Sequence, residues 1–250
     1  MQAINMKKQS FLLSLAIIGS LSACVAQGDP KLSEQWKPVP PVINPGSSAQ
    51  APSDAIVLFD GKNLSEWVSA KDGSSPAGWL VENGILTVKA GTGDIKTKQQ
   101  FEDFQLHVEW RTPAKVEGDG QGRGNSGIFL MEQYELQVLD SYGSTTYSNG
   151  QAGSIYKQTM PLVNACKGPG EWQTYDVIFT APRFHDNGML KSPAKITVLH
   201  NNILVQNNTT IAGATEYIGL ATYKKHGPLG IKLQDHGNPV SFRNIWLRKL

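Results

Sequence analysis

Apolar and polar residues alternate along much of this chain, and this period of two constrains its fold more than any other feature. Residues 104–111 place Leu106, Val108 and Trp110 on one side of the backbone, opposite four polar or charged residues. Residues 134–140 repeat the pattern, with Leu136 and Val138 on the apolar side. Because successive side chains of a β-strand point to opposite faces, each segment is expected to be a strand with one buried face.

Further short strands follow from the same pattern, each bounded by Gly, Asn, Asp or Pro. Asn83-Gly84 and Asn201-Asn202 have the residues of tight hairpin turns. No segment past residue 53 has a sustained 3.6-residue period with helix caps, which argues against βαβ units. The sequence therefore predicts an all-β fold, a two-sheet antiparallel sandwich of jelly-roll type. The other strands are expected at residues 55–59, 79–81, 85–88, 175–180, 194–200, 203–206, 218–221, 230–234 and 240–247.

The N-terminus has the pattern of a lipoprotein signal peptide, residues 1–23. Two lysines precede an apolar stretch, residues 11–21, which is shorter than the roughly 20 residues that a membrane span needs. The stretch ends in Leu21-Ser22-Ala23-Cys24, which resembles the bacterial lipobox, whose cysteine carries the lipid. An ordinary signal peptide is the alternative. Residues 24–52 contain six prolines and are expected to form a tether, followed by one domain at residues 53–250.

These features predict a protein of the cell envelope that reaches the membrane through a lipid on Cys24. Val25 in place of Asp after the lipidated cysteine is compatible with sorting to the outer membrane, on its periplasmic or its surface face. The other cysteine, Cys166, would then have no disulfide partner within the chain. The domain is therefore expected to be held together by its own core.

Neither a nucleic acid nor a nucleotide is an expected partner. The net charge is +2 with 18% charged residues and no clustered basic surface. GRGNSG, residues 122–127, has the G-x-G-x-x-G spacing of a dinucleotide-binding turn, which needs a strand directly before it and a helix directly after it. Here the preceding strand ends near Arg111, and the following residues lead into the strand at residues 134–140. The glycines are instead expected to permit a sharp entry into the next strand, with Asn125 as a candidate substrate contact.

Two strands carry polar residues along a whole face and flank this glycine-rich loop. If they belong to one sheet, Glu109 and Arg111 would share a surface with Glu135 and Gln137. The carboxylates of Glu109 and Glu135 could then do acid–base chemistry, with Arg111 orienting one of them or binding substrate. A solvent-facing sheet surface without chemistry is the alternative.

No metal or cofactor is expected. His226 and His236 each precede a glycine in turn-rich sequence, without the close spacing of zinc ligands.

Nine motifs occur in order through the domain, and together they indicate a family. They are LFDGKNL (58–64) with Trp67, FEDFQL (101–106), EWR (109–111), GNSGI (124–128), YELQVLD (134–140), GSIY (153–156), GEW (170–172), LQDHG (233–237) and VSFRNI (240–245). Over residues 54–250 the chain resembles the 3-keto-disaccharide (3-keto-glycoside) hydrolase domain family, long catalogued as a domain of unknown function. The resemblance implies a concanavalin A-like lectin/glucanase jelly roll and a carbohydrate substrate.

The resemblance also implies cleavage of glycosides that are already oxidised to a ketone at C3 of the sugar. Such a ketone acidifies the proton on C2, so a base can remove it and the C1 oxygen can leave by elimination, after which water can add to the enone. This route needs one base, one acid for the leaving group, and donors for the developing enolate. Ordinary glycosidases instead use two carboxylates around an oxocarbenium-like transition state.

Within the matched motifs, Glu135 or His236 is expected to be the base or the acid. Arg111 and Asn125 are expected to hold oxygens near the enolate. The other residues expected in the pocket are Glu109, Gln137, Asp140, Tyr156 and Gln234. Two alternatives remain: a non-catalytic, lectin-like carbohydrate-binding protein on the same fold, and a structural envelope lipoprotein without a ligand.

Overall fold

The computed structural model describes residues 28–47 and 50–250. They divide into two units, one that ends at Val42 and one that runs from Ile43 to Leu250. The first contains a short 3-10 helix, η1 (Pro30–Ser33). Asp29 caps its N-terminus, where the Asp29 side chain accepts a hydrogen bond from the backbone N–H of Lys31. No helix in these described ranges is long and apolar enough to cross a bilayer. The predicted signal peptide and Cys24 lie outside the described residues.

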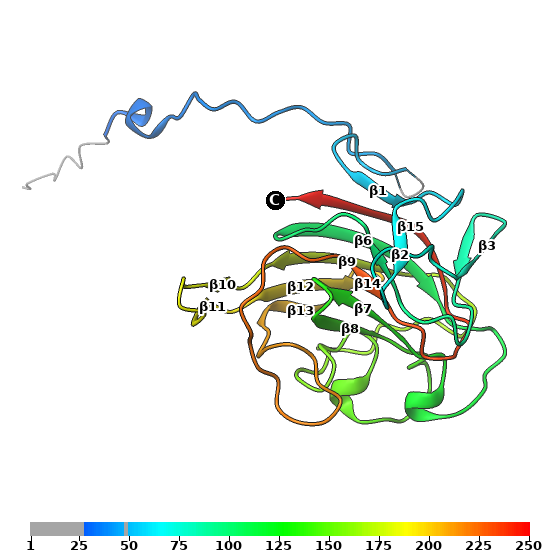
Figure 1. The fold of residues 1–250 in the computed structure, drawn as a ribbon. Coiled ribbons are helices and arrows are strands. Elements are labelled where there is room, and N and C mark those ends of the chain that lie inside the picture. The colour runs from blue at the N-terminus through cyan, green and yellow to red at the C-terminus, as the bar shows by residue number, and fades with distance from the viewer. Residues whose placement is uncertain (1–27, 48–49) are drawn as a thin grey trace, which may run out of the picture. The chain divides into compact units, whose positions relative to one another are not determined.

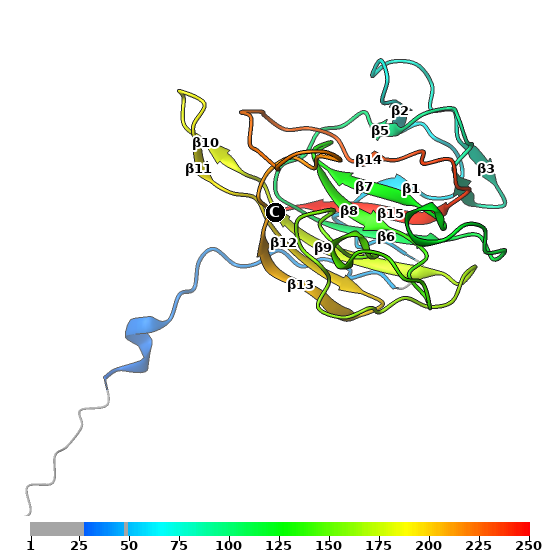
Figure 2. The same cartoon turned by 90° about the horizontal axis from the view of Figure 1, so that it is seen from below.

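The strands of the second unit form two antiparallel sheets that lie one over the other (Figures 1 and 2). The eight-stranded sheet contains, in order, β13 (Ile203–Thr210), β12 (Lys195–His200), β9 (Gln173–Thr180), β6 (Phe104–Arg111), β15 (Ser241–Lys249), β4 (Ile85–Thr87) and β3 (Leu80–Glu82), with β1 (Ile56–Phe59) also paired to β15. The five-stranded sheet contains, in order, β2 (Trp67–Ser69), β5 (Ile95–Thr97), β14 (Lys232–Leu233), β7 (Ser126–Leu130) and β8 (Tyr134–Val138). The predicted two-sheet antiparallel sandwich is confirmed.

The remaining elements are small and lie outside the two sheets. β10 (Arg183–Phe184) and β11 (Leu190–Ser192) pair only with each other in the described chain. Two further 3-10 helices, η2 (Gly120–Gly122) and η3 (Ser148–Gly150), lie in the long connections that flank β7 and β8. These connections supply part of the site described below.

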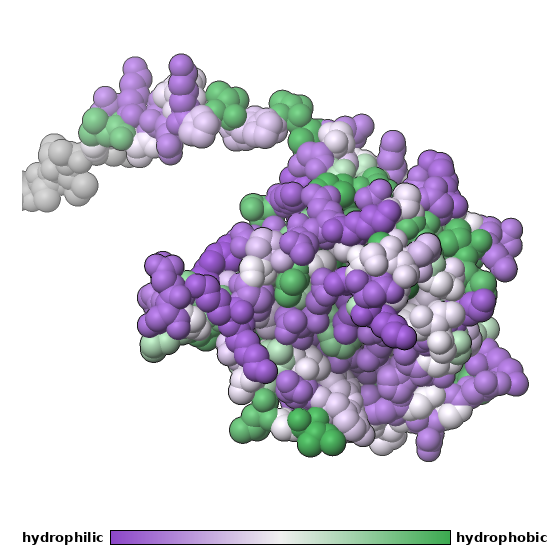
Figure 3. Space-filling model, viewed as in Figure 1, coloured by the Kyte–Doolittle hydropathy of each residue, from purple (hydrophilic) through white to green (hydrophobic). Residues whose placement is uncertain are grey.

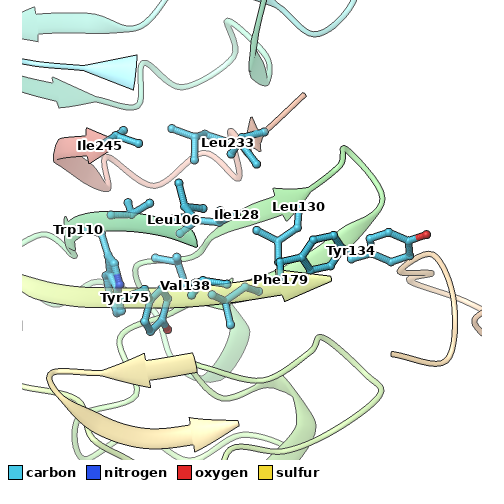
Figure 4. Close-up of a cluster of buried hydrophobic side chains, with 14 of the residues drawn as sticks. Leu106, Trp110, Ile128, Leu130, Tyr134, Val138, Tyr175, Phe179, Leu233 and Ile245 are labelled. Carbon is cyan, nitrogen blue, oxygen red and sulfur yellow. The ribbon is translucent and has the colours of Figure 1, made fainter. Parts of the chain in front are cut away.

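The core fills the space between the two sheets with side chains from the apolar faces of their strands. Trp110 of β6 and Tyr175 of β9 come from the large sheet, and Ile128 of β7 and Val138 of β8 face them from the small one (Figure 4). All four are fully buried. The Tyr175 hydroxyl donates a hydrogen bond of 2.8 Å to the backbone oxygen of Gln137, which ties the sheets together. Apolar burial of about 25 cal/mol per Å² makes this layer the main source of stability.

The turn residues behave as their sequence predicts. Asn83 and Gly84 have φ values of 51° and 78°, and Asn201 and Asn202 have values of 52° and 65°. Two consecutive residues with positive φ are typical of type I′ hairpin turns, which match the twist of the strands they join. They connect β3 to β4 and β12 to β13, so both expected hairpins are confirmed.

The strand expected at residues 218–221 is wrong. This segment belongs to a loop, in which Ile218 is 83% exposed and Leu220 is 88% exposed. Although the residues alternate, the segment pairs with no strand in the described chain. The short strands β2, β5 and β7 were not expected from the sequence.

The surface is mainly hydrophilic on the face seen in Figure 3, where apolar side chains form separate patches rather than one continuous area. Isolated apolar side chains of this kind are normal for a protein surface and do not by themselves mark an interface.

Candidate functional site

The polar faces of β6 and β8 point to opposite sides of the sandwich. Both strands direct their apolar residues into the shared core, so their polar residues face away from it in opposite directions. β6 lies in the eight-stranded sheet and β8 in the five-stranded sheet. The expectation that Glu109 and Arg111 share a surface with Glu135 and Gln137 is therefore wrong.

Glu109 and Arg111 belong instead to a polar network on the outer face of the large sheet. The Glu109 carboxylate accepts hydrogen bonds from Arg243 Nε at 2.6 Å and from Asn244 Nδ2 at 2.8 Å. The guanidinium of Arg111 lies 4.7 Å from the centre of the Trp172 ring. These contacts pair the Glu109 charge and pack Arg111 on the sheet surface, far from Glu135. Neither residue enters the function proposed below.

A cavity of about 740 Å³ opens on the face of the small sheet that points away from the core. It brings together six of the residues that the sequence predicts for the site, which are Asn125, Glu135, Gln137, Tyr156, Gln234 and His236. Seven further residues contribute to its lining in the described chain without having been predicted for the site: Gln121, Gly122, Phe129, Tyr147, Lys157, Thr215 and Tyr217. A cavity of this size can hold a sugar with part of its substituent.

Strand register explains why the predicted residues meet. β7 pairs with β8 so that Phe129 faces Glu135 and Gly127 faces Gln137. On the other side of β7, the backbone N–H of Gln234 donates to the oxygen of Gly127 at 3.0 Å. Directly opposed residues project to the same face of a sheet, so these side chains form two adjacent rows on the cavity floor.

Glu135 is the buried carboxyl group of this floor. It is 5% exposed, and its carboxylate has no hydrogen-bond partner among the described residues. Burial raises the pKa of Glu135 to about 8, against a smaller lowering effect of Lys232 and with a further raising effect of Asp94. A carboxyl with a pKa near neutrality can gain and lose a proton during turnover, as general acid–base catalysis requires.

Gly127 provides the space that the Glu135 side chain occupies. A Cβ atom at position 127 would lie 2.6 Å from Glu135 Oε1 and 3.0 Å from Phe129 Cε2. Gly127 does not have a left-handed backbone, so its role is steric, unlike that of Gly124 with φ of 57°. GRGNSG thus leads into strand β7 and not into a helix, which agrees with the rejection of a nucleotide site.

Two glutamines present unsatisfied acceptors at the cavity. Gln137 Nε2 donates to Gln121 Oε1 at 3.2 Å and to Asn125 Oδ1 at 3.3 Å. The Oε1 atoms of Gln137 and Gln234 are buried and accept no hydrogen bond from the described residues. Buried polar atoms are almost always hydrogen-bonded. Both atoms are closed to solvent, so a bound sugar hydroxyl can donate to them once the amide groups turn toward the cavity.

His236 lies at the exposed rim of the cavity, in the loop that follows β14. Its neighbour Asp235 holds this loop in place: the backbone N–H of Asp235 donates to Asp94 Oδ1 at 2.9 Å, and the Asp235 carboxylate accepts from Gly93 and Gly237. The imidazole can therefore reach a ligand from the solvent side of the cavity.

Asp140 lies outside this cavity, contrary to expectation. Its carboxylate accepts a hydrogen bond from Arg123 Nε at 2.7 Å and borders a separate hollow of about 180 Å³. Arg123 also donates to the backbone oxygen of Tyr142 at 2.9 Å. Asp140 comes after the end of β8, where the chain has left the sheet, so it holds the glycine-rich loop and does not extend the row of Glu135 and Gln137.

The wall of tyrosines and Lys157 could not be predicted from the pattern of strands. Tyr147 and Tyr156 belong to the long connection after β8, and their hydroxyl groups share a hydrogen bond of 2.5 Å. Tyr217 comes from the loop after β13, sixty residues from Lys157, whose Nζ donates to the Tyr217 backbone oxygen at 2.6 Å. Only Tyr156 fell within a family motif. No group of three or more His, Cys, Asp or Glu residues in the described parts of the chain is arranged to hold a metal ion.

The buried Glu135 is expected to lower stability as the pH rises. Between 4.5, its ordinary carboxyl value, and about 8, the folded state keeps a proton that the unfolded state releases, so the free energy of unfolding falls with pH. Glutamine does not ionise, so the free energy of unfolding of Glu135→Gln does not fall with pH in this way. The variant should therefore be more stable than the wild type by about 3 kcal/mol at pH 7.

Urea unfolding of both proteins from pH 4 to pH 9 measures this difference. The matched control is Glu82→Gln, in exposed β3, which should leave the pH dependence unchanged. A constant difference between wild type and Glu135→Gln across this range would contradict the raised pKa.

Comparison with known proteins agrees with this fold. The sequence profile of a family described as the 3-keto-alpha-glucoside-1,2-lyase-like domain matches residues 54–248. A protein named 3-keto-disaccharide hydrolase, from Bacteroides thetaiotaomicron, is 24% identical, and the alignment covers 81% of this chain and 82% of that protein.

Two solved structures with this fold are from Parabacteroides distasonis. One candidate glycosyl hydrolase is 53% identical, with a TM-score of 0.86 over 89% of this chain and 97% of that chain. A second candidate glycosyl hydrolase is 20% identical, with a TM-score of 0.56 over 79% of this chain and 94% of that chain, and this likeness concerns the fold.

Proposed function

The chain belongs to the 3-keto-alpha-glucoside-1,2-lyase-like domain family, and from this membership we propose that it cleaves the glycosidic bond of 3-keto-glycosides. The observation that carries the proposal is the buried carboxyl of Glu135 in a cavity whose free acceptors suit sugar hydroxyls. The first part of the reaction is an elimination. Water then adds to the enone where the overall reaction is a hydrolysis.

Glu135 is the base of the proposed reaction. Its carboxylate takes the proton from C2, and the electron pair of that C–H bond forms the enolate between C2 and C3. The enolate then returns to a ketone as the C1–O bond breaks. A base with a pKa near 8 is matched to this task, because it is strong enough to take a carbon-bound proton and is still partly ionised near pH 7.

His236 is the acid of the proposed reaction. The departing alkoxide needs a proton, and His236 lies at the rim, where the released alcohol can leave to solvent. Gln137 and Gln234 turn their amide oxygens toward the cavity, accept hydrogen bonds from sugar hydroxyls and set the orientation of the ring above Glu135. Base and acid thus act from the floor and from the rim of one cavity.

The direct test is release of the aglycone. Purified full-length protein is incubated with 4-nitrophenyl 3-keto-glucoside and with unoxidised 4-nitrophenyl glucoside, and 4-nitrophenol is followed by absorbance. Release from the 3-keto compound alone is expected. Release from neither, together with measurable binding of either sugar, would favour the lectin-like alternative and overturn the proposal.

We also propose that the domain is held in the cell envelope by a lipid on Cys24, on the outer membrane. The support is the order of charged, apolar and small residues before this cysteine. The protein expressed with its own N-terminus should enter the detergent phase of Triton X-114, and Cys24→Ser should remain in the aqueous phase. Wild-type protein in the aqueous phase would contradict lipidation.

A further inference from the structure

Lys157 is held at the cavity in an unusual backbone conformation. Its φ is 58°, in the left-handed region, which costs a residue other than glycine on the order of 1–3 kcal/mol. Its backbone N–H donates to the oxygen of Asn149 at 2.8 Å, which fixes the turn. The fold thus places a lysine where glycine would adopt the same conformation at lower cost, and such positions cluster at functional sites.

The ammonium group of Lys157 lies among three tyrosine rings. Its Nζ is 4.2 Å from the ring centre of Tyr217, 5.8 Å from that of Tyr156 and 5.9 Å from that of Tyr147. Its one hydrogen bond within the described chain goes to the Tyr217 backbone oxygen, so two of its three N–H donors are left. The rings hold the cation by cation–π attraction without neutralising it.

Two other lysines near this face contrast with Lys157. Lys96 is paired with Glu132 at 2.9 Å, and Lys232 is paired with Asp94 at 3.2 Å. Lys157 has no carboxylate within 4.0 Å among the described residues, and it borders the cavity that also contains Glu135. Among these lysines it is the one whose positive charge is left for a ligand.

The two residues that the sequence suggested as enolate donors are less suitable. Arg111 lies on the other side of the sandwich, against Trp172. Asn125 is 4% exposed, with its amide nitrogen donating to the backbone oxygen of Gln121 at 2.7 Å and its amide oxygen accepting from Gln137 Nε2. Its amide orients the loop, which leaves Lys157 as the cationic donor in the cavity.

We propose that Lys157 is a catalytic residue that donates a hydrogen bond to the C3 oxygen of the 3-keto sugar and stabilises the enolate formed when Glu135 removes the C2 proton. As the proton moves to Glu135, the C2–H electron pair becomes the C2–C3 double bond and negative charge develops on the C3 oxygen. Lys157 is an exposed residue at the cavity wall, and its ammonium, held by the Tyr217 backbone oxygen and the tyrosine rings, stabilises the charge that develops on that oxygen. Tyr156 lies next to both groups: its backbone N–H donates to the backbone oxygen of Glu135 at 3.1 Å, and its ring centre is 5.8 Å from Lys157 Nζ.

The inference rests on the proposed function, and one set of variants separates the two. The kcat and KM of Lys157→Met are measured with 4-nitrophenyl 3-keto-glucoside, and exchange of the C2 proton of methyl 3-keto-glucoside is followed by NMR in D₂O. We expect kcat and the exchange rate to fall about 10²–10³-fold, with KM changed little. The matched control is Lys225→Met, an exposed lysine outside the cavity whose Nζ also donates to a backbone oxygen, of Asp186 at 3.1 Å.

Chemical rescue distinguishes catalysis from a structural role. Methylammonium added to Lys157→Ala should restore part of kcat and of the exchange rate, because it can occupy the space of the lost ammonium. Wild-type kcat in Lys157→Met, or a loss in Lys157→Ala that methylammonium does not restore, would overturn the role of Lys157 while leaving the proposed function intact. Absence of both turnover and exchange in the wild type would overturn the proposed function, and this inference with it.

Discussion

Glu135→Gln is expected to lower kcat/KM for 4-nitrophenyl 3-keto-glucoside by 10²-fold or more, to about the level reached without proton transfer. The amide keeps the size and the buried position of the side chain but cannot accept the C2 proton. The wild-type rate should rise with pH and level off above about 8, because Glu135 acts in its ionised form. The residual rate of the variant should lack this rise. Initial rates between pH 5 and pH 10 measure both effects.

Glu109→Gln is the matched control for this prediction. Glu109 is also a strand glutamate, 8% exposed, but it faces the opposite side of the sandwich, where Arg243 and Asn244 bind its carboxylate. Its replacement should leave kcat/KM within about threefold of the wild type. The hydrogen bonds that Glu109 makes with Arg243 and Asn244 are remote from the cavity, so weakening them changes the free energy of unfolding and not the rate. Wild-type turnover by Glu135→Gln, or an equal loss in both variants, would exclude Glu135 as the base.

The same substitution separates function from stability. Glu135→Gln should unfold at higher urea than the wild type near pH 7 while turning over more slowly, because the buried carboxyl costs stability in proportion to its raised pKa. A residue that only supported the fold would lose stability and activity together. Opposite signs in the two measurements are therefore a specific signature of a catalytic group.

Alternation along the sequence predicted the strands well because it follows directly from the geometry of a half-buried sheet. Residues 104–111 form β6 with the expected face buried, and Glu135 and Gln137 of β8 face away from the core as expected. Alternation cannot assign a strand to a sheet, however. A strand with one polar face looks the same on either side of a sandwich, which is why Glu109 and Arg111 were wrongly placed beside Glu135.

The site itself could be predicted only where it lies on strands or in family motifs. Gln234 and His236 were found through a motif, and their approach to Glu135 follows from the pairing of β14 with β7. Lys157 and Tyr217 come together from two loops through a hydrogen bond from the Lys157 side chain to the Tyr217 backbone oxygen. Loop residues have no period, and contacts over such a separation depend on the whole chain, so no local pattern indicates them.

Gly127→Ala is expected to lower kcat about 10²-fold with little effect on stability. The added Cβ would lie 2.6 Å from Glu135 Oε1 and 3.1 Å from Glu135 Cγ, so the Glu135 side chain must move away from the floor. A displacement of about 1 Å at a reacting group costs on the order of 10²-fold in rate. The shortest contact falls on the end of the flexible Glu135 side chain, the Phe129 ring at 3.0 Å must shift by a few tenths of an ångström, and the φ of Gly127 is not left-handed, so the backbone can accept alanine. Kinetics and thermal unfolding of the purified variant measure both effects.

Gly227→Ala provides the comparison, because a Cβ at that position meets no atom within 4 Å and Gly227 lies outside the cavity. It should keep wild-type kcat. Since alanine restricts the unfolded chain more than glycine, both variants should stay within about 1 kcal/mol of the wild-type free energy of unfolding. If Gly127→Ala turned over as fast as Gly227→Ala, the position of Glu135 above Gly127 would be irrelevant to the reaction. A large kinetic loss in the folded Gly127→Ala protein alone would instead show that the rate depends on the position of the Glu135 carboxyl group. Gly127, the last residue of GRGNSG, leaves the space that this group occupies.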